Sequence, residues 1–141
     1  MIKKILKVII PIILLLIFIF YFKPYPQKIN LPEISKLSIT ISSNYGSVEL
    51  QNEQKEELYN IISDLKIIWN PFFAIPEKFY SHDMVSILSS VGVIITAFPE
   101  GDSFNNKTPY AFVSKWKDVN RIIINDKPLL DFLKKYLKKS N

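Results

Sequence analysis

The chain has 141 residues, no cysteine and a formal net charge of +5 at pH 7. The absence of cysteine excludes a disulfide framework, lipoprotein processing and a thiolate metal site. Four of the 18 basic residues precede residue 24, and the remaining 14 are balanced by 13 acidic residues. The part after residue 24 is therefore nearly neutral, and we expect no nucleic-acid partner.

The first element is an apolar run over residues 5–22 that contains a single charge, Lys7. A helix of that length is about 27 Å long, close to the thickness of the hydrocarbon core of a bilayer. The run ends in aromatic residues and prolines, whereas a cleaved signal peptide ends in small residues. The sequence therefore predicts an uncleaved, single-pass transmembrane anchor over residues 1–22.

The lysines that flank the apolar run predict its orientation. Lys3, Lys4 and Lys7 precede its centre together with the terminal amine, while Lys23 and Lys28 follow it. By the positive-inside rule, this modest excess predicts an N-terminus inside the cell membrane and a domain outside.

Three prolines, Pro24, Pro26 and Pro32, follow the anchor. Because proline fixes φ and lacks an N–H donor, the segment 23–35 is predicted to be an extended, stiff stalk that lifts the domain off the headgroups. The remaining residues, 36–141, are enough for one extracytoplasmic domain with its own core.

The first half of the domain alternates and then becomes helical. Alternating apolar and polar residues on both sides of Asn44-Tyr45-Gly46 predict a hairpin within residues 37–50. Apolar residues at helical spacing predict a helix over residues 53–65. The segment 66–80 is irregular and aromatic in pattern.

The second half contains four strand-like segments and a final helix. Their short connections favour an antiparallel four-strand meander, so we predict an α+β fold. The segments lie within residues 84–88, 92–98, 110–116 and 121–125. Asp126 is expected to cap a C-terminal helix whose apolar side packs on the sheet.

Catalytic chemistry finds little support in the pattern. His82 is the only histidine and stands between Ser81 and Asp83, but consecutive residues cannot form a catalytic triad with one another. Glu100 and Asp102 flank a turn glycine and fall short of a calcium-binding loop. We therefore expect no enzyme, no metal site and no cofactor, and an uncharacterised hydrolase is the least favoured alternative.

Two features are candidate binding surfaces. Large aromatic side chains after the first domain helix either complete the core or form an exposed patch for a partner. They are Trp69, Phe72, Phe73, Phe79 and Tyr80. Lysines on the last helix are either a solvated face or a basic patch for an anionic surface. They are Lys134, Lys135, Lys138 and Lys139.

Two stretches carry a resemblance to other proteins. Leu31-Pro32-Glu33-Ile34 precedes a first strand, and the segment 121–133 runs from a last strand into a short amphipathic helix. This layout resembles short, N-terminally membrane-anchored Gram-positive (clostridial and bacillary) proteins of unknown function with an extracytoplasmic α+β domain. The resemblance covers most of the chain, implies no catalytic residue or ligand, and favours a non-enzymatic surface protein.

These observations lead to two functional expectations. The first is a membrane-anchored binding or accessory module whose partner is a protein, a cell-wall polymer or an anionic lipid. The second is an immunity or stress-protection protein that shields its own membrane from an antimicrobial peptide.

Overall fold

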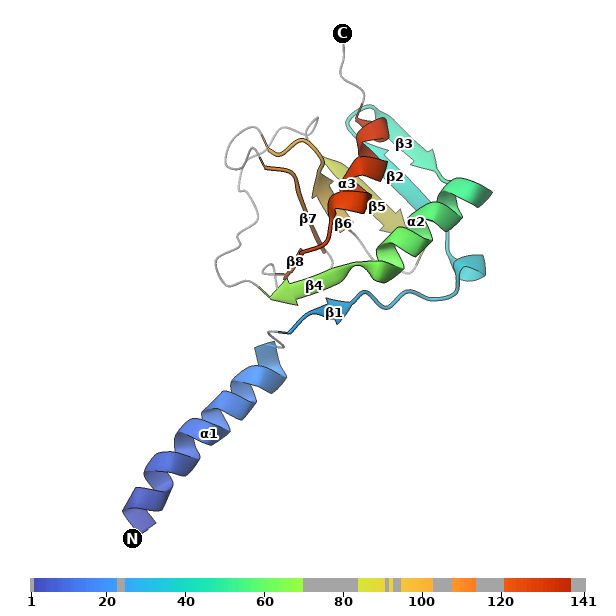
Figure 1. The fold of residues 1–141 in the computed structure, drawn as a ribbon. Coiled ribbons are helices and arrows are strands. Elements are labelled where there is room, and N and C mark those ends of the chain that lie inside the picture. The colour runs from blue at the N-terminus through green and yellow to red at the C-terminus, as the bar shows by residue number, and fades with distance from the viewer. Residues whose placement is uncertain are drawn as a thin grey trace.

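The computed structural model describes residues 2–22, 25–69, 84–90, 92, 95–102, 108–113 and 121–137. They form an N-terminal helix followed by a sheet with two helices on one face (Figure 1). The helices are α1 (Ile2–Phe22), α2 (Asn52–Asp64) and α3 (Lys127–Leu133), with short 3₁₀ turns η1 (Ile34–Lys36) and η3 (Lys134–Tyr136). The predicted α+β class is confirmed.

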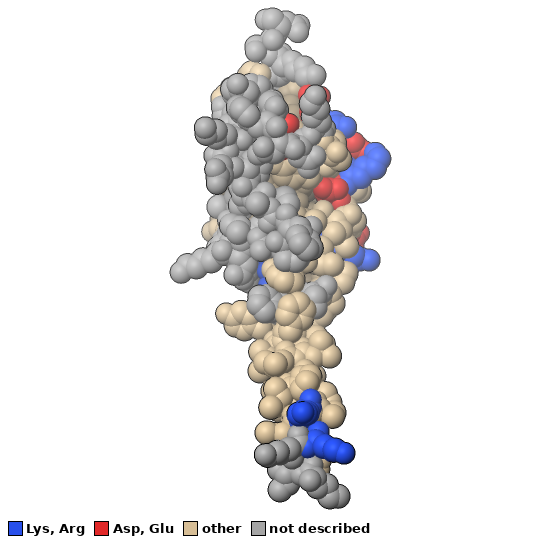
Figure 2. Space-filling view, turned by 90° about the vertical axis from the view of Figure 1, so that its left-hand side faces the viewer, with Lys and Arg blue, Asp and Glu red and all other residues tan. Residues whose placement is uncertain are grey.

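Helix α1 is long and apolar enough to cross a membrane, judged by its length and composition. The candidate span is Lys4–Tyr21, and none of it is buried. Figure 2 shows that the charged side chains of α1 lie toward its N-terminal end, with an uncharged surface between them and the domain. Such a surface suits contact with lipid tails.

One antiparallel sheet contains the eight described strands in the order β1-β4-β8-β7-β6-β5-β2-β3. The strands are β1 (Gln27–Lys28), β2 (Ile39–Ser43), β3 (Gly46–Glu49), β4 (Lys66–Trp69), β5 (Val85–Ser89), β6 (Ile95–Phe98), β7 (Tyr110–Val113) and β8 (Arg121–Ile123). The four segments predicted as a meander are the neighbouring strands β5, β6, β7 and β8, but the sheet is larger than the four strands expected. Strand β5 pairs with β2 of the hairpin, and β4 and β1 extend the sheet beyond β8.

The core lies between the sheet and helices α2 and α3. Leu58 and Ile62 of α2 and Leu129 and Leu133 of α3 are buried against the strands. Asp126 is the N-cap residue of α3 as expected, but its side chain makes no capping hydrogen bond. Its Oδ2 instead accepts a hydrogen bond from the backbone N–H of Ala111 at 3.1 Å, which joins the start of α3 to β7.

Part of the segment predicted as a stalk belongs to the domain. Gln27 and Lys28 pair with Ile67 and Lys66 of β4, and Leu31 packs against the core. An extended segment flanked by prolines is compatible with an edge strand as well as with a spacer. The sequence pattern alone therefore does not distinguish between the two.

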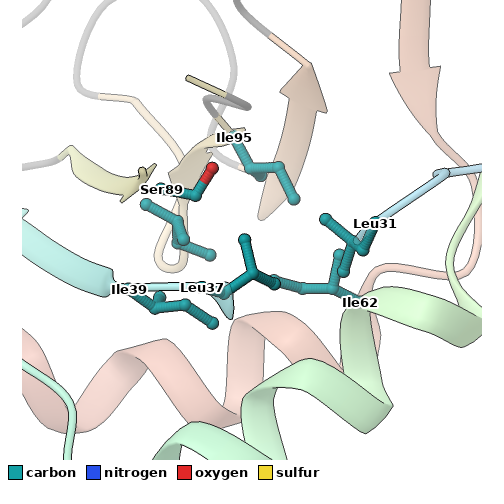
Figure 3. A pocket seen from close by; sticks show the side chains of 7 residues that line it. Leu31, Leu37, Ile39, Ile62, Ser89 and Ile95 are labelled. Carbon is teal, nitrogen blue, oxygen red and sulfur yellow. The ribbon is translucent and has the colours of Figure 1, made fainter. Parts of the chain in front are cut away.

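Leu31 also lines a small hollow in the core, on which side chains from α2 and the central strands converge (Figure 3). The cavity volume is about 10 Å³ and its lining is almost entirely apolar. A hollow of this size holds at most one water, which needs polar partners. It is therefore a packing gap beneath Leu31 and offers no room for a ligand.

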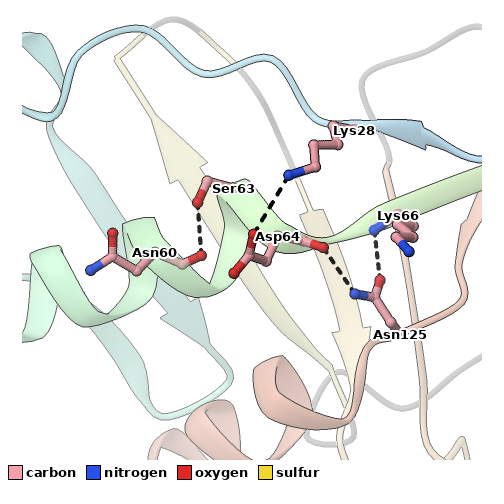
Figure 4. A network of polar contacts seen from close by, with 6 residues as sticks. All are labelled: Lys28, Asn60, Ser63, Asp64, Lys66 and Asn125. Atoms are coloured by element: carbon pink, nitrogen blue, oxygen red, sulfur yellow. Dashed lines mark hydrogen bonds and ion pairs between the residues drawn. The ribbon is translucent and has the colours of Figure 1, made fainter.

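Polar contacts join β1 and β4 to the end of α2 (Figure 4). The Lys28 ammonium lies 3.6 Å from the Asp64 carboxylate. The Asn125 side chain donates to the backbone carbonyl of Asp64 at 2.9 Å and accepts from the backbone N–H of Lys66 at 2.6 Å. One amide thus satisfies a carbonyl at the helix end and an N–H at the start of the next strand.

Candidate functional site

Strand β3 forms the open edge of the sheet. Its four residues, Gly46–Glu49, are all exposed, and among the described strands it pairs only with β2. An edge strand presents outward-directed backbone N–H and C=O groups, which are a template for another extended chain.

The hydrogen-bond pattern identifies which groups point outward. The backbone N–H of Leu50 donates to the carbonyl of Ile39 at 2.9 Å, so this pair is hydrogen-bonded. Because bonded and non-bonded pairs alternate in an antiparallel ladder, Val48 is bonded to β2, whereas Ser47 and Glu49 direct their backbone groups away from it. The backbone N–H and C=O groups of these two residues are therefore the ones that an added strand would meet.

The turn before β3 leaves space at the edge. Gly46 has φ +125°, a conformation that residues with a Cβ rarely adopt, and a Cβ placed there would meet nothing within 4 Å. Ser43 Oγ accepts from the backbone N–H of Tyr45 at 3.3 Å. Tyr45, the residue before this glycine, is 42% exposed.

A cavity of about 130 Å³ lies between the hairpin and the end of the C-terminal helix. Its lining is partly polar and consists of Ile41, Ser43, Tyr45, Gly46, Ser47, Val48, Lys135 and Tyr136. Cavities of about 150 Å³ bind molecules of the size of benzene. The cavity beside β3 therefore has room for one apolar or aromatic side chain.

Two residues of η3, Lys135 and Tyr136, line this cavity. The Lys135 ammonium lies 3.6 Å from the ring centroid of Phe132 and 5.4 Å from that of Tyr136, and cation–π attraction favours this position. Among the described residues, nothing hydrogen-bonds to the buried hydroxyl of Tyr136. Burial, and secondarily the charge of Glu57, raises the pKa of Tyr136, so this hydroxyl keeps its proton at neutral pH.

Two lysines of the predicted basic patch, Lys134 and Lys135, are described; both are exposed, and they differ in their contacts. Lys134 Nζ lies 3.4 Å from Asp131, which also pairs with Lys127. The hydrogen bond from Lys127 is the main cause that lowers the pKa of Asp131. Lys135 instead belongs to the cavity wall. Lys138 and Lys139 lie outside the described residues.

The predicted aromatic surface is described at one residue only. Trp69 is half-buried at the end of β4, and its ring meets that of Phe18 of α1 edge-to-face at a centroid distance of 5.8 Å. Trp69 thus lies near the anchor, on the side of the sheet away from β3. Phe72, Phe73, Phe79 and Tyr80 lie outside the described residues.

The acidic turn is a structural feature. Asp102 is only 2% exposed and accepts a hydrogen bond from the Tyr110 hydroxyl at 3.1 Å. Burial, and then this contact, raises the pKa of Tyr110, while Glu100 is exposed. No three potential metal ligands gather within the described part of the chain, and His82 lies outside it.

The chain matches no protein-family model, no curated protein sequence and no solved structure. The β3 edge and its cavity are therefore the features from which a function can be inferred. Sequence reasoning missed this site, because Tyr45 and Tyr136 come from opposite ends of the domain. The available signal was the aromatic and apolar pair Tyr45 and Val48 around a turn glycine.

Proposed function

We propose that this chain is a non-enzymatic, single-pass membrane protein whose extracytoplasmic domain binds a partner through the β3 edge. The length and composition of α1 support the anchor. The lysines near its N-terminus support an orientation with the N-terminus inside. The exposed β3 edge beside a cavity is the observation that carries the binding role.

An extended peptide segment is the partner that fits this edge. It would add as a strand to β3 and bond with the outward groups of Ser47 and Glu49. Val48 and Ile41 are cross-strand partners, so they share a face, and both line the cavity. Every second side chain of the added strand would lie on that face, and one would enter the cavity beside Lys135 and Tyr136.

The test uses the full chain in lipid nanodiscs with a library of synthetic peptides of about six residues, a usual strand length. Peptides with alternating apolar residues should bind. Ser47→Pro removes an outward N–H without breaking the bonded pairs to β2, and we expect it to weaken binding about tenfold, the effect of losing an edge hydrogen bond and its alignment.

The matched control is Ser47→Ala, which keeps the backbone N–H and removes only the hydroxyl. It should bind peptides like the unaltered chain. Equal binding by the Ser47→Pro variant, or binding of a wall polymer or anionic lipid in place of every peptide, would overturn the proposed peptide site.

A second variant tests the cavity itself. Val48 lines the cavity and is 49% exposed, so Val48→Ala removes apolar contact with an entering side chain while changing stability little. Peptide affinity should fall several-fold. Unchanged affinity would place the ligand outside the cavity.

The anchor is tested separately. Full-length protein should stay in the membrane fraction after an alkaline carbonate wash, and protease added to intact cells should cut the domain. The immunity and hydrolase alternatives stay predictions, and so does the resemblance to Gram-positive anchored proteins.

A further inference from the structure

The connection between anchor and domain is too short for a spacer. Helix α1 ends at Phe22, and β1 begins at Gln27. Fully extended, the chain between these two residues spans at most about 18 Å. From Gln27 onward the chain pairs with β4, so no further residue adds to this distance.

The contact between Phe18 and Trp69 places the domain closer still. Phe18 lies one turn before the end of α1, about 6 Å back along the helix axis. Its ring centroid is 5.8 Å from that of Trp69 in β4. Phe18 also lies inside the candidate span Lys4–Tyr21, so Trp69 is level with the last turn of the segment that would cross the bilayer.

The residues around this junction have the chemistry of a membrane interface. Tyr21 and Tyr25 are 78% and 51% exposed, and together with Trp69 they give three amphipathic rings around the junction between α1 and β1. Tyrosine and tryptophan concentrate where hydrocarbon meets the headgroups, because the ring prefers apolar surroundings and the polar atom prefers water.

The β1–β4 edge also carries positively charged side chains. Lys28 and Lys66 are direct cross-strand partners, an arrangement that normally destabilises a sheet because like charges lie on one face. Asp64 offsets part of this repulsion through its contact with Lys28. An anionic headgroup layer would offset the rest.

Taking these steps together, we propose that the domain lies directly on the membrane, with the β1–β4 edge and Trp69 in the lipid headgroup region. This inference rests on the proposed anchoring by α1. Because β3 is at the other end of the strand order, the same placement directs the open edge toward the aqueous phase.

Tryptophan fluorescence tests this placement in the full chain. The chain has two tryptophans, so Trp116→Phe leaves Trp69 as the single reporter. The protein is reconstituted in phosphatidylcholine–phosphatidylglycerol vesicles that carry spin-labelled lipids, with the label either near the headgroup or at mid-chain. We expect headgroup-level labels to quench Trp69 several-fold more than mid-chain labels.

The control reporter sits at the opposite edge. Tyr45→Trp, combined with Trp69→Phe and Trp116→Phe, should be quenched by aqueous acrylamide and not by either lipid label. Trp69 would contradict the inference if it behaved in the same way while the protein stayed with the vesicles. Protein that leaves the vesicles would overturn the anchor itself, and the inference with it.

Single cysteines provide a second measurement that spares the tryptophans. The chain has no cysteine, so Lys66→Cys and Val48→Cys each create one labelling position on an exposed residue. An attached spin label should be several-fold more accessible to a lipid-soluble relaxing agent at position 66 than at position 48. Equal accessibility at the two positions would overturn the proposed placement.

Discussion

The two edges of the sheet differ in length and in how they are held to the rest of the domain. Strand β1 has only two residues, yet it is held by pairing with β4, by Leu31 in the core and by an ion pair to α2. Strand β3 is longer, and all its residues are exposed. Open edges invite pairing with other chains, and proteins usually cover or charge them. A very short edge strand offers little to pair with, so the longer, fully exposed β3 is the better candidate for a partner.

The largest expected effect comes from Leu31, which holds the β1 edge in place. Fully buried leucines lose about 2–5 kcal/mol on truncation to alanine, and Leu31 is half-buried against the core. We expect Leu31→Ala to lower the free energy of unfolding by about 1–3 kcal/mol. Urea unfolding of the full chain in detergent micelles, followed by tryptophan fluorescence, measures it.

Val48→Ala on the β3 edge is the matched control for Leu31→Ala. Val48 is 49% exposed, so its truncation should change stability by less than about 0.5 kcal/mol. Equal losses at the two positions would show that the two edges contribute alike to the fold, and the contrast between them would disappear.

The next effect concerns the amide that joins α2, β4 and the loop after β8. Asn125→Ala removes two hydrogen bonds that cross from one segment to another. Both are exposed to solvent, so we expect a loss of about 1–2 kcal/mol, measured by the same unfolding experiment. Ser63→Ala removes only a local bond to the carbonyl of Asn60 and should be close to neutral. A neutral Asn125→Ala would mean that water replaces this amide without cost.

Local patterns predict the parts of the fold that repeat along the chain. The helical spacing of Leu58 and Ile62 predicts α2, and alternation around the turn at Gly46 predicts the β2–β3 hairpin. Strand β4 follows α2 after a single residue, with no glycine or proline between them. Its partners, such as Ile123 opposite Ile67, come from the other end of the domain, and no local rule reports such a pairing.

The candidate site is hidden from sequence for the same reason. The lysine pattern of the last helix predicts exposed cations, and Lys134 and Lys135 are exposed. The pattern does not predict their contacts, which are Asp131 for Lys134 and the Phe132 ring for Lys135. The cavity depends on the approach of η3 to a hairpin that lies far away in the sequence. Charge and hydropathy describe single elements, whereas this site exists only where two elements meet.

Asp126, at the start of α3, gives a pH-dependent test between the two edges, because it is hydrogen-bonded to the inner strand β7. Burial raises its pKa, although the N–H of Ala111 opposes the shift. The pKa of Asp126 is therefore higher in the folded state than in the unfolded state, where it is about 4. The stability that this group contributes is fully present below the unfolded-state pKa and is lost as the pH rises through the folded-state pKa. The side-chain amide introduced by Asp126→Asn is neutral at every pH, so this variant should gain stability over the unaltered chain across that interval.

The quantity to measure is the difference in the free energy of unfolding between the Asp126→Asn variant and the unaltered chain. Urea unfolding from acid to neutral pH gives this difference. Asp131 has a lowered pKa, so its contribution is lost as the pH falls, but it is shared by both chains and cancels. A difference that stays constant with pH would show that the Asp126 carboxyl titrates alike in the folded and unfolded states.

The smallest expected effect is that of Lys28, although its ion pair with Asp64 joins β1 to α2. The two side chains are 68% and 82% exposed, and exposed ion pairs contribute about 0–1 kcal/mol, less as salt increases. In detergent micelles, Lys28→Ala should therefore change stability by less than about 0.5 kcal/mol. If the β1–β4 edge rests on lipid, the same substitution should have a larger effect in anionic vesicles than in neutral ones, because Lys28 would then also meet headgroup charge. If the effect of Lys28→Ala did not depend on lipid charge, Lys28 would interact with Asp64 only. That result would contradict the proposal that the β1–β4 edge lies on the membrane.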